Sequence, residues 1–174
     1  GGNSDLSNFD FLKAEWPDIY EAAAKSEGLA HQDPRASCFY ARRSLELAVS
    51  WLYRSDCALR LPYQDHLAAL IHEPTFRDSV GPKIFTKARL LKDLGNMAVH
   101  SSRPVRQADA LTAVRELFHL CFWLVHAYAR GAKPPDKLAF DDSLLLKGPA
   151  IPAQTQAQLQ DLAMQESQGT IVDR

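Results

Sequence analysis

The longest uninterrupted helical pattern in the chain lies between two prolines, and it constrains the fold more than any other feature. Asp33-Pro34 is a favoured N-cap and first-turn pair, and no Gly or Pro follows before Pro62. Apolar side chains recur there at steps of three and four residues, which places them on one face of a helix. The pattern predicts an amphipathic helix of about six to seven turns. Its apolar positions are Cys38, Ala41, Leu45, Ala48, Val49, Leu52 and Tyr53.

Similar patterns predict helices on both sides of this one, while no stretch shows the alternation of a strand. Glu73-Pro74 and Gly81-Pro82 predict breaks between them. We therefore expect an all-α bundle of about five main helices over residues 1–132, followed by an irregular linker or tail over 133–174. The further expected helices span 17–28, 64–72, 83–99 and 106–130, with a short polar helix over 154–165.

Composition excludes several classes of protein. The 174 residues suffice for one domain with a buried core, and 20 basic against 21 acidic residues exclude a strongly basic nucleic-acid-coating protein. No apolar run reaches the ~18 residues of a membrane span. Three widely spaced cysteines predict buried free thiols in a reducing cytoplasm rather than disulfides or a zinc site. The Gly-Gly start without Met suggests a piece of a longer chain.

The near-zero net charge conceals an uneven distribution. Residues 1–33 carry a net charge of −5 and residues 134–174 carry −3, whereas 34–60 and 100–133 each carry +3. The acidic ends either neutralise the middle within one fold or leave a modest basic face for nucleic acid or an acidic partner. A nucleic-acid-binding face would use the arginines of the basic segments. The candidates are Arg35, Arg42, Arg43, Arg103 and Arg106.

Catalytic motifs are absent from the sequence except for one helical stretch. It has no Gly-rich phosphate loop, no G-x-S-x-G and no H-E-x-x-H. In the run 91–100, Asn96 and His100 are four residues apart and share a helical face. Gly95 costs about 1 kcal/mol relative to Ala inside a helix, which predicts the close approach of the second or the last helix. His100 can cap the helix end, or act as a general acid/base or phosphate contact.

Two stretches resemble type I restriction endonuclease R subunits. Ser7-Asn8-Phe9-Asp10-Phe11-Leu12 looks like their start, and Leu94-Gly95-Asn96-Met97-Ala98-Val99-His100 resembles the helical domain that precedes their nuclease and helicase domains. The resemblance implies a non-catalytic module of a cytoplasmic, ATP-dependent DNA translocase and endonuclease. Its partners would be modification and specificity subunits, with DNA contacted by the parent protein. It also implies no cofactor or metal in this stretch, whereas ATP and Mg would serve the parent.

The same region is similar to the HEPN superfamily of helical bundles, some of which are ribonucleases acting as dimers. Those enzymes usually carry Arg-Asn-x-x-x-His, and Asn96 and His100 match its second half. Gly95 takes the place of the arginine, so the cation that stabilises the transition state is missing or displaced to Lys92. The resemblance therefore implies, as an alternative, a ribonuclease homodimer using His100, Asn96 and Lys92.

Overall fold

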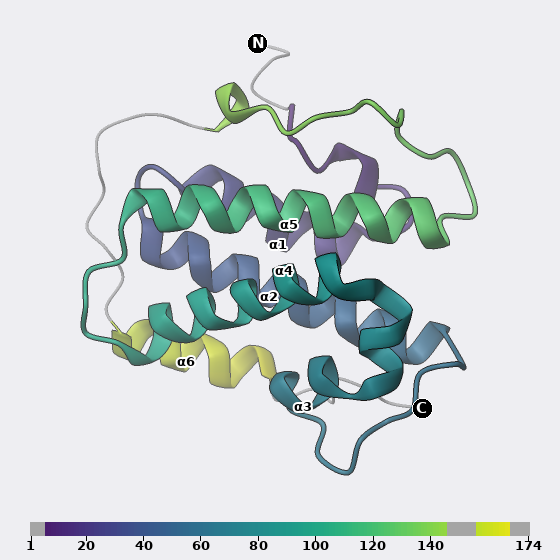
Figure 1. Ribbon diagram of the computed structural model, residues 1–174. Coiled ribbons are helices and arrows are strands. Elements are labelled where there is room, and N and C mark those ends of the chain that lie inside the picture. Colours follow the sequence, from purple (N-terminus) through teal and green to yellow (C-terminus); the bar gives the residue numbers. More distant parts are fainter. Residues whose placement is uncertain (1–5, 146–155, 168–174) are drawn as a thin grey trace.

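The computed structural model describes residues 6–145 and 156–167. Within these ranges the regular secondary structure consists of helices, with no strand (Figure 1). The predicted all-α class with an irregular C-terminal region is confirmed. Five of the six helices in the described residues have seven or more residues, whereas the helix expected over 64–72 has only six. The helices are α1 (Pro17–Leu29), α2 (Pro34–Ser55), α3 (Leu67–His72), α4 (Pro74–His100), α5 (Gln107–Tyr128) and α6 (Gln156–Ser167), with short 3-10 turns η2 (Asp10–Leu12) and η3 (Asp142–Leu144).

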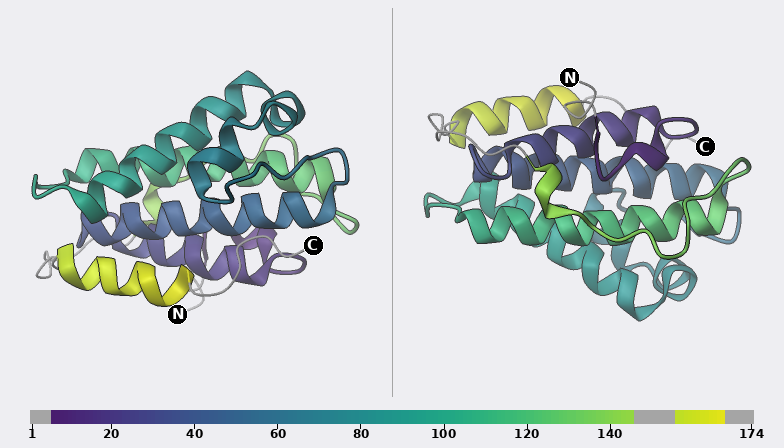
Figure 2. Two further views of the ribbon diagram at one scale, coloured as in Figure 1. Left: turned by 90° about the horizontal axis from the view of Figure 1, so that it is seen from below. Right: turned by 90° about the horizontal axis from the view of Figure 1, so that it is seen from above.

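Helix α2 forms as the sequence predicts and occupies the centre of the bundle. Asp33 caps it, since its side chain accepts a hydrogen bond from the Ala36 N–H at 3.2 Å, and Pro34 takes the first helical position. The helix packs against α1, α4 and α5 (Figures 1 and 2). Because it has neighbours on several sides, all its predicted apolar positions are buried.

Helix α4 contains a kink where the sequence predicts a break. Gly81 has φ +83° and ψ 167°, a backbone conformation that side chains rarely allow, and Pro82 follows it. The residues from Pro74 to Gly81 and the helix expected over 83–99 form one bent helix, which ends at His100. Helix α3 is shorter than predicted and begins at Leu67, where the His66 side chain accepts from the Ala69 N–H at 3.3 Å.

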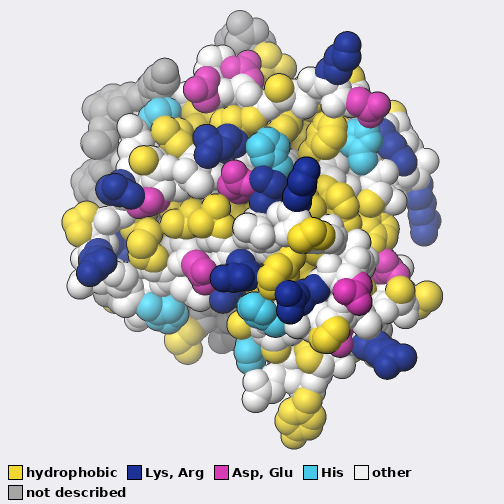
Figure 3. Space-filling view, viewed as in Figure 1, with side chains coloured by type: hydrophobic (Ala, Val, Ile, Leu, Met, Phe, Trp, Pro, Cys, Tyr) yellow, Lys and Arg dark blue, Asp and Glu magenta, His cyan; other side chains and the backbone are white. Residues whose placement is uncertain are grey.

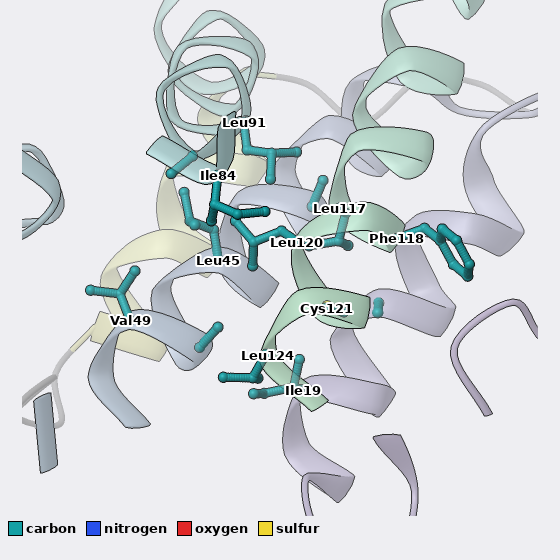
Figure 4. Packing of buried hydrophobic residues seen from close by; sticks show 14 of the residues in the cluster. Ile19, Leu45, Val49, Ile84, Leu91, Leu117, Phe118, Leu120, Cys121 and Leu124 are labelled. Carbon is teal, nitrogen blue, oxygen red and sulfur yellow. The ribbon is translucent and has the colours of Figure 1, made fainter. Parts of the chain in front are cut away.

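One contiguous hydrophobic core holds these helices together (Figure 4). Leu45 of α2, Leu91 of α4 and Leu117 of α5 are fully buried within it. The N-terminal segment joins the same core, because Phe9 is buried and its ring centroid lies 6.4 Å from that of Phe118. None of the described helices combines the length and hydropathy needed to span a membrane.

Segments after residue 132 also contact the bundle. Leu145 is buried in the core and Phe140 packs against it. Helix α6 lies along one edge (Figure 2), where Leu159 is buried with Phe39 of α2 and Val99 of α4. The domain boundary expected at residue 132 stays a prediction. Pro149 and Pro152, two of the residues on which the expected irregular tail depended, lie outside the described residues.

Candidate functional site

Three of the expected catalytic residues follow one another along α4. Lys92, Asn96 and His100 are each four residues apart, so they lie on successive turns of one side of the helix. Lys92 Nζ lies 3.2 Å from Asp93 Oδ1, Asn96 is half-buried, and His100 is exposed at the last residue of the helix. The arrangement places an imidazole within reach of solvent at a helix end.

Gly95 lies directly beneath the side chain of Arg42 from α2. A Cβ at residue 95 would lie 2.3 Å from Arg42 Cβ, 2.4 Å from Cδ and 2.8 Å from Cγ. These distances are shorter than any van der Waals contact, so only glycine fits. The sequence predicted that either the second or the last helix approaches Gly95. In the structure the second helix, α2, makes this contact.

Arg42 and Arg43 share one acidic partner on their own helix. Arg42 Nη1 lies 3.0 Å from Glu46 Oε1, and Arg43 Nη1 lies 3.5 Å from Glu46 Oε2. Glu46 is only 9% exposed, so its carboxylate is bound by the two arginines rather than by water. Two of the arginines predicted to contact nucleic acid therefore have their charge opposed within the fold.

Arg35 serves as a cap for the end of α4. Its Nη1 donates to Ala98 O at 2.6 Å and to Ser101 O at 2.9 Å, and its Nη2 donates to Arg103 O. Carbonyls at a helix C-terminus lack partners within the helix, and the guanidinium supplies them. This predicted nucleic-acid residue thus has a structural role in the fold.

The two remaining arginines lie beyond α4 and differ in their surroundings. Arg106 is exposed and pairs with Asp109 across the first turn of α5, with Nη2 at 3.4 Å from Oδ1. Arg103 is exposed, and its side chain has no ion pair among the residues that the structure describes. The five predicted arginines therefore do not gather into one unpaired basic face.

A different group of basic side chains, of which the sequence singled out only Lys92, lies near Phe85. Arg77 Cζ lies 4.5 Å and Arg89 Cζ lies 5.8 Å from the centre of the Phe85 ring. The His72 ring stands edge-on to it at 5.3 Å. On the face shown in Figure 3, Lys, Arg and His side chains are interspersed with Asp, Glu and hydrophobic side chains. Lys92 lies close enough to His72 for its charge to act on that side chain. We call His72, Arg77, Arg89 and Lys92 the Phe85 cluster.

The charges of the Phe85 cluster act on its histidine. Loss of solvation lowers the pKa of His72, and Lys92, Arg89 and Arg77 lower it further, while Asp93 opposes them. All three cations thus lie close enough to disfavour a fourth positive charge. The kink at Gly81 separates Arg77 from Arg89, so their proximity follows from tertiary structure rather than from sequence spacing.

A second polar group ties α4 to α5. Lys87 Nζ pairs with Glu116 Oε2, and it lies 3.5 Å from His119 Nδ1. Burial lowers the pKa of His119, as does Lys87, whereas Glu116 raises it. His119 thus lies beside the ion pair that joins α4 to α5.

The cysteines divide into two environments. Cys38 and Cys121 are buried, and burial raises the pKa of the Cys38 thiol to about 12. Cys57 is exposed, so the prediction that all three thiols are buried is wrong, because α2 ends at Ser55 and Cys57 falls in the loop beyond it. Within residues 6–145 and 156–167, no group of three or more His, Cys, Asp or Glu side chains is placed to hold a metal.

Comparison with known proteins identifies one family. Residues 25–140 match the family described as "Domain of unknown function (DUF4145)". No curated protein and no solved structure matches the chain. The matched range covers the C-terminal end of α1, all of α2 to α5, the contact between Gly95 and Arg42, and the Phe85 cluster.

Proposed function

We propose that the chain, which belongs to the DUF4145 family, is a non-catalytic helical module of a type I restriction enzyme R subunit, used for subunit assembly or DNA contact. One observation supports this most directly. Both stretches that resemble R subunits, residues 7–12 and 94–100, contribute packing contacts to one bundle.

The first stretch is an integral part of the domain. Phe9 and Leu12 are fully buried. The Asn8 N–H and Nδ2 donate to Glu27 Oε2 at 2.8 and 2.9 Å, which fixes the segment against α1. A buried, hydrogen-bonded opening segment is consistent with a module that presents one rigid surface to partner subunits.

The second stretch lacks the charge that phosphate cleavage needs. Gly95 stands beside Asn96, and the nearest guanidinium over it belongs to Arg42, which Glu46 opposes. A cation that stabilises a phosphorane-like transition state must be free to face the substrate. In the proposed parent, the nuclease and the ATP- and Mg-dependent motor belong to other domains.

Native mass spectrometry tests the assembly role. The 174-residue chain is mixed, without DNA, with the modification and specificity subunits, and a complex containing the chain is expected. The control is the Glu27→Ala chain, measured above its melting temperature. An unfolded chain lacks the surface that the proposal requires, so no complex is expected. An R subunit that assembles, translocates and cuts normally after loss of residues 1–130 overturns the proposal.

A HEPN-like ribonuclease dimer is the second candidate, and the line of Lys92, Asn96 and His100 along α4 favours it. In this role His100 moves the proton, while Asn96 and Lys92 position the phosphate. Light scattering measures whether the chain is a dimer, and incubation with RNA compares it with His100→Ala. Cleavage that is lost in His100→Ala supports the ribonuclease, and absence of His100-dependent cleavage removes it.

A further inference from the structure

We infer that His72, Arg77, Arg89 and Lys92 form a binding site for the phosphodiester backbone of DNA, organised by the ring of Phe85. The inference rests on the proposed function for its choice of DNA, and it assigns that contact to residues other than the five predicted arginines.

Phe85 holds the cationic groups in place. The ring is 8% exposed, so it forms the floor of the cluster rather than a stacking surface for a base. Arg77 and Arg89 lie against it at 4.5 and 5.8 Å, within the range of cation–π attraction. A guanidinium fixed in this way loses less conformational freedom when it binds a ligand.

The bend in α4 brings the two arginines to the same ring. Arg77 precedes Gly81 and Arg89 follows Pro82, and the φ of +83° at Gly81 redirects the chain between them. His72, the last residue of α3, reaches the same ring from another element. The cluster therefore depends on three segments that the fold brings together, and not on charged residues that are neighbours in the sequence.

Positive charge in the cluster exceeds the negative charge that faces it. Arg77 and Arg89 are exposed and have no ion pair among the described residues, while Lys92 pairs with Asp93 at 3.2 Å. Asp78 lies with Arg77 along the groove beside Pro82. Gathering like charges is unfavourable in the free protein, and a bound anion relieves it.

A nucleic-acid backbone matches this arrangement better than a single anion does. Guanidinium groups present paired N–H donors that fit phosphate oxygens, and lysine adds a point charge. Arg77 and Arg89 reach the Phe85 ring from the two arms of the bent helix, so they can engage neighbouring phosphates rather than one. The contacts would be to backbone and would carry no base sequence.

Fluorescence anisotropy with a labelled DNA duplex tests the site. Arg77→Gln and Arg89→Gln are each expected to weaken binding about tenfold and to reduce the slope of log K against log salt by about 0.9 per lost phosphate contact. Lys137→Gln, which removes an exposed cation far along the chain, is the matched control and is expected to leave both unchanged. If Arg77→Gln and Arg89→Gln behave like Lys137→Gln, the inference is overturned.

Phe85→Leu tests the positioning role without removing a charge. It is expected to weaken DNA binding severalfold while Arg77 and Arg89 keep their charge, and a thermal melt identifies any loss of folding. If a folded Phe85→Leu chain binds DNA as tightly as the wild type does, the ring has no positioning role.

Competition identifies the chemistry of the ligand. Duplex RNA that binds as tightly as DNA supports a general phosphodiester site, and DNA that binds more tightly supports the stated one. Polyglutamate of equal charge is the control. If it displaces DNA as effectively as unlabelled DNA does, the assignment to phosphate is overturned.

Assembly with the partner subunits is measured without DNA, so an Arg77→Gln, Arg89→Gln double variant that assembles but loses DNA binding separates the two proposals. A wild-type chain that binds DNA through the cluster but does not assemble leaves the site standing and rejects the assembly role.

Discussion

The stem of Arg42 fills the space that a Cβ at residue 95 would need, and this contact fixes the distance between α2 and α4. The guanidinium of Arg42 then turns to Glu46 on its own helix. A glycine that is unfavourable for helix formation is therefore explained by packing with the central helix.

Replacing Gly95 with Ala is expected to destabilise the fold. Overpacking costs about 1–3 kcal/mol, and contacts as short as 2.3 Å put Gly95→Ala in the upper part of that range, at about 2–3 kcal/mol. The better helix propensity of Ala returns about 1 kcal/mol, so the free energy of unfolding should fall by about 1–2 kcal/mol. Urea denaturation measures it, with Asn96→Ala as a neighbouring control. Arg42→Ala should rescue part of the loss in the double variant, because the Cγ and Cδ contacts disappear while the Cβ contact remains. A Gly95→Ala chain as stable as the wild type contradicts the steric explanation.

The cap of α2 offers a test with a matched pair of variants. Asp33→Ala should lower the free energy of unfolding by about 1–2 kcal/mol, because the Ala36 N–H loses its acceptor. Asp33→Asn keeps an oxygen at this position and should lower it by less. Equal losses for the two variants in chemical denaturation would show that the charge of Asp33 matters more than its capping bond.

Asn8 connects three segments through one side chain. Its Nδ2 donates to Glu27 Oε2 and Asp141 O, both at 2.9 Å, and its Oδ1 accepts from the Asp141 N–H at 2.8 Å. Asn8→Ala should reduce stability by about 2–3 kcal/mol and speed hydrogen exchange at the Asp141 amide.

Asn8→Asp supplies the control for this network. It keeps an acceptor for the Asp141 N–H but sets a second carboxylate beside buried Glu27. At neutral pH it should be no more stable than Asn8→Ala, and it should recover relative to that variant in acid. A more stable Asn8→Asp chain at neutral pH would contradict the expected repulsion between the two carboxyl groups.

Stability should fall in mild acid through two histidines. Burial lowers the pKa of His119 and of His72 below the ordinary 6.5, so the unfolded chain takes up protons more readily than the folded one. Their contribution is complete above 6.5 and is lost as the pH falls below it. Thermal melts between about pH 7 and about pH 5 should show a smaller decline for a His119→Gln chain than for the wild type. An unchanged decline in that variant contradicts the assignment to His119.

Thiol reactivity should separate the three cysteines. Burial raises the pKa of Cys38 to about 12 and also raises that of Cys121, whereas Cys57 is exposed. Since the thiolate is the reactive form, a disulfide reagent such as DTNB should label Cys57 alone in the folded chain and all three in denaturant. Cys57→Ser should leave the folded chain unlabelled, and rapid labelling of that variant would place Cys38 or Cys121 at the surface.

The sequence predicted α2 well because its cap, its apolar spacing and its lack of breakers all depend on residues close together in the chain. The side chain of Asp33 needs only Ala36 to act as a cap. Gly95 was also informative, since an unfavourable residue in a helix indicates a close neighbour. The kink at Gly81 followed from the Gly-Pro pair in the same local way.

The use of the arginines could not be predicted from the sequence. Arg35 binds carbonyls more than sixty residues away, and no local pattern reports such a partner. The Phe85 cluster likewise depends on the bend of α4 and on the return of α3 to the same ring. Charge counts along a sequence give the number of cations in a segment, but only the tertiary structure shows which of them remain unopposed.

The reciprocal hydrogen bonds between Asn8 and Asp141 have a mechanical consequence. They bring two points 133 residues apart in the chain into direct contact. A pulling force applied between these two points would load the two bonds first, before any helix of the bundle was stretched. The segments that lie between them would come under tension only after these two hydrogen bonds had broken. The two bonds would therefore set the force at which the domain begins to unfold along this direction.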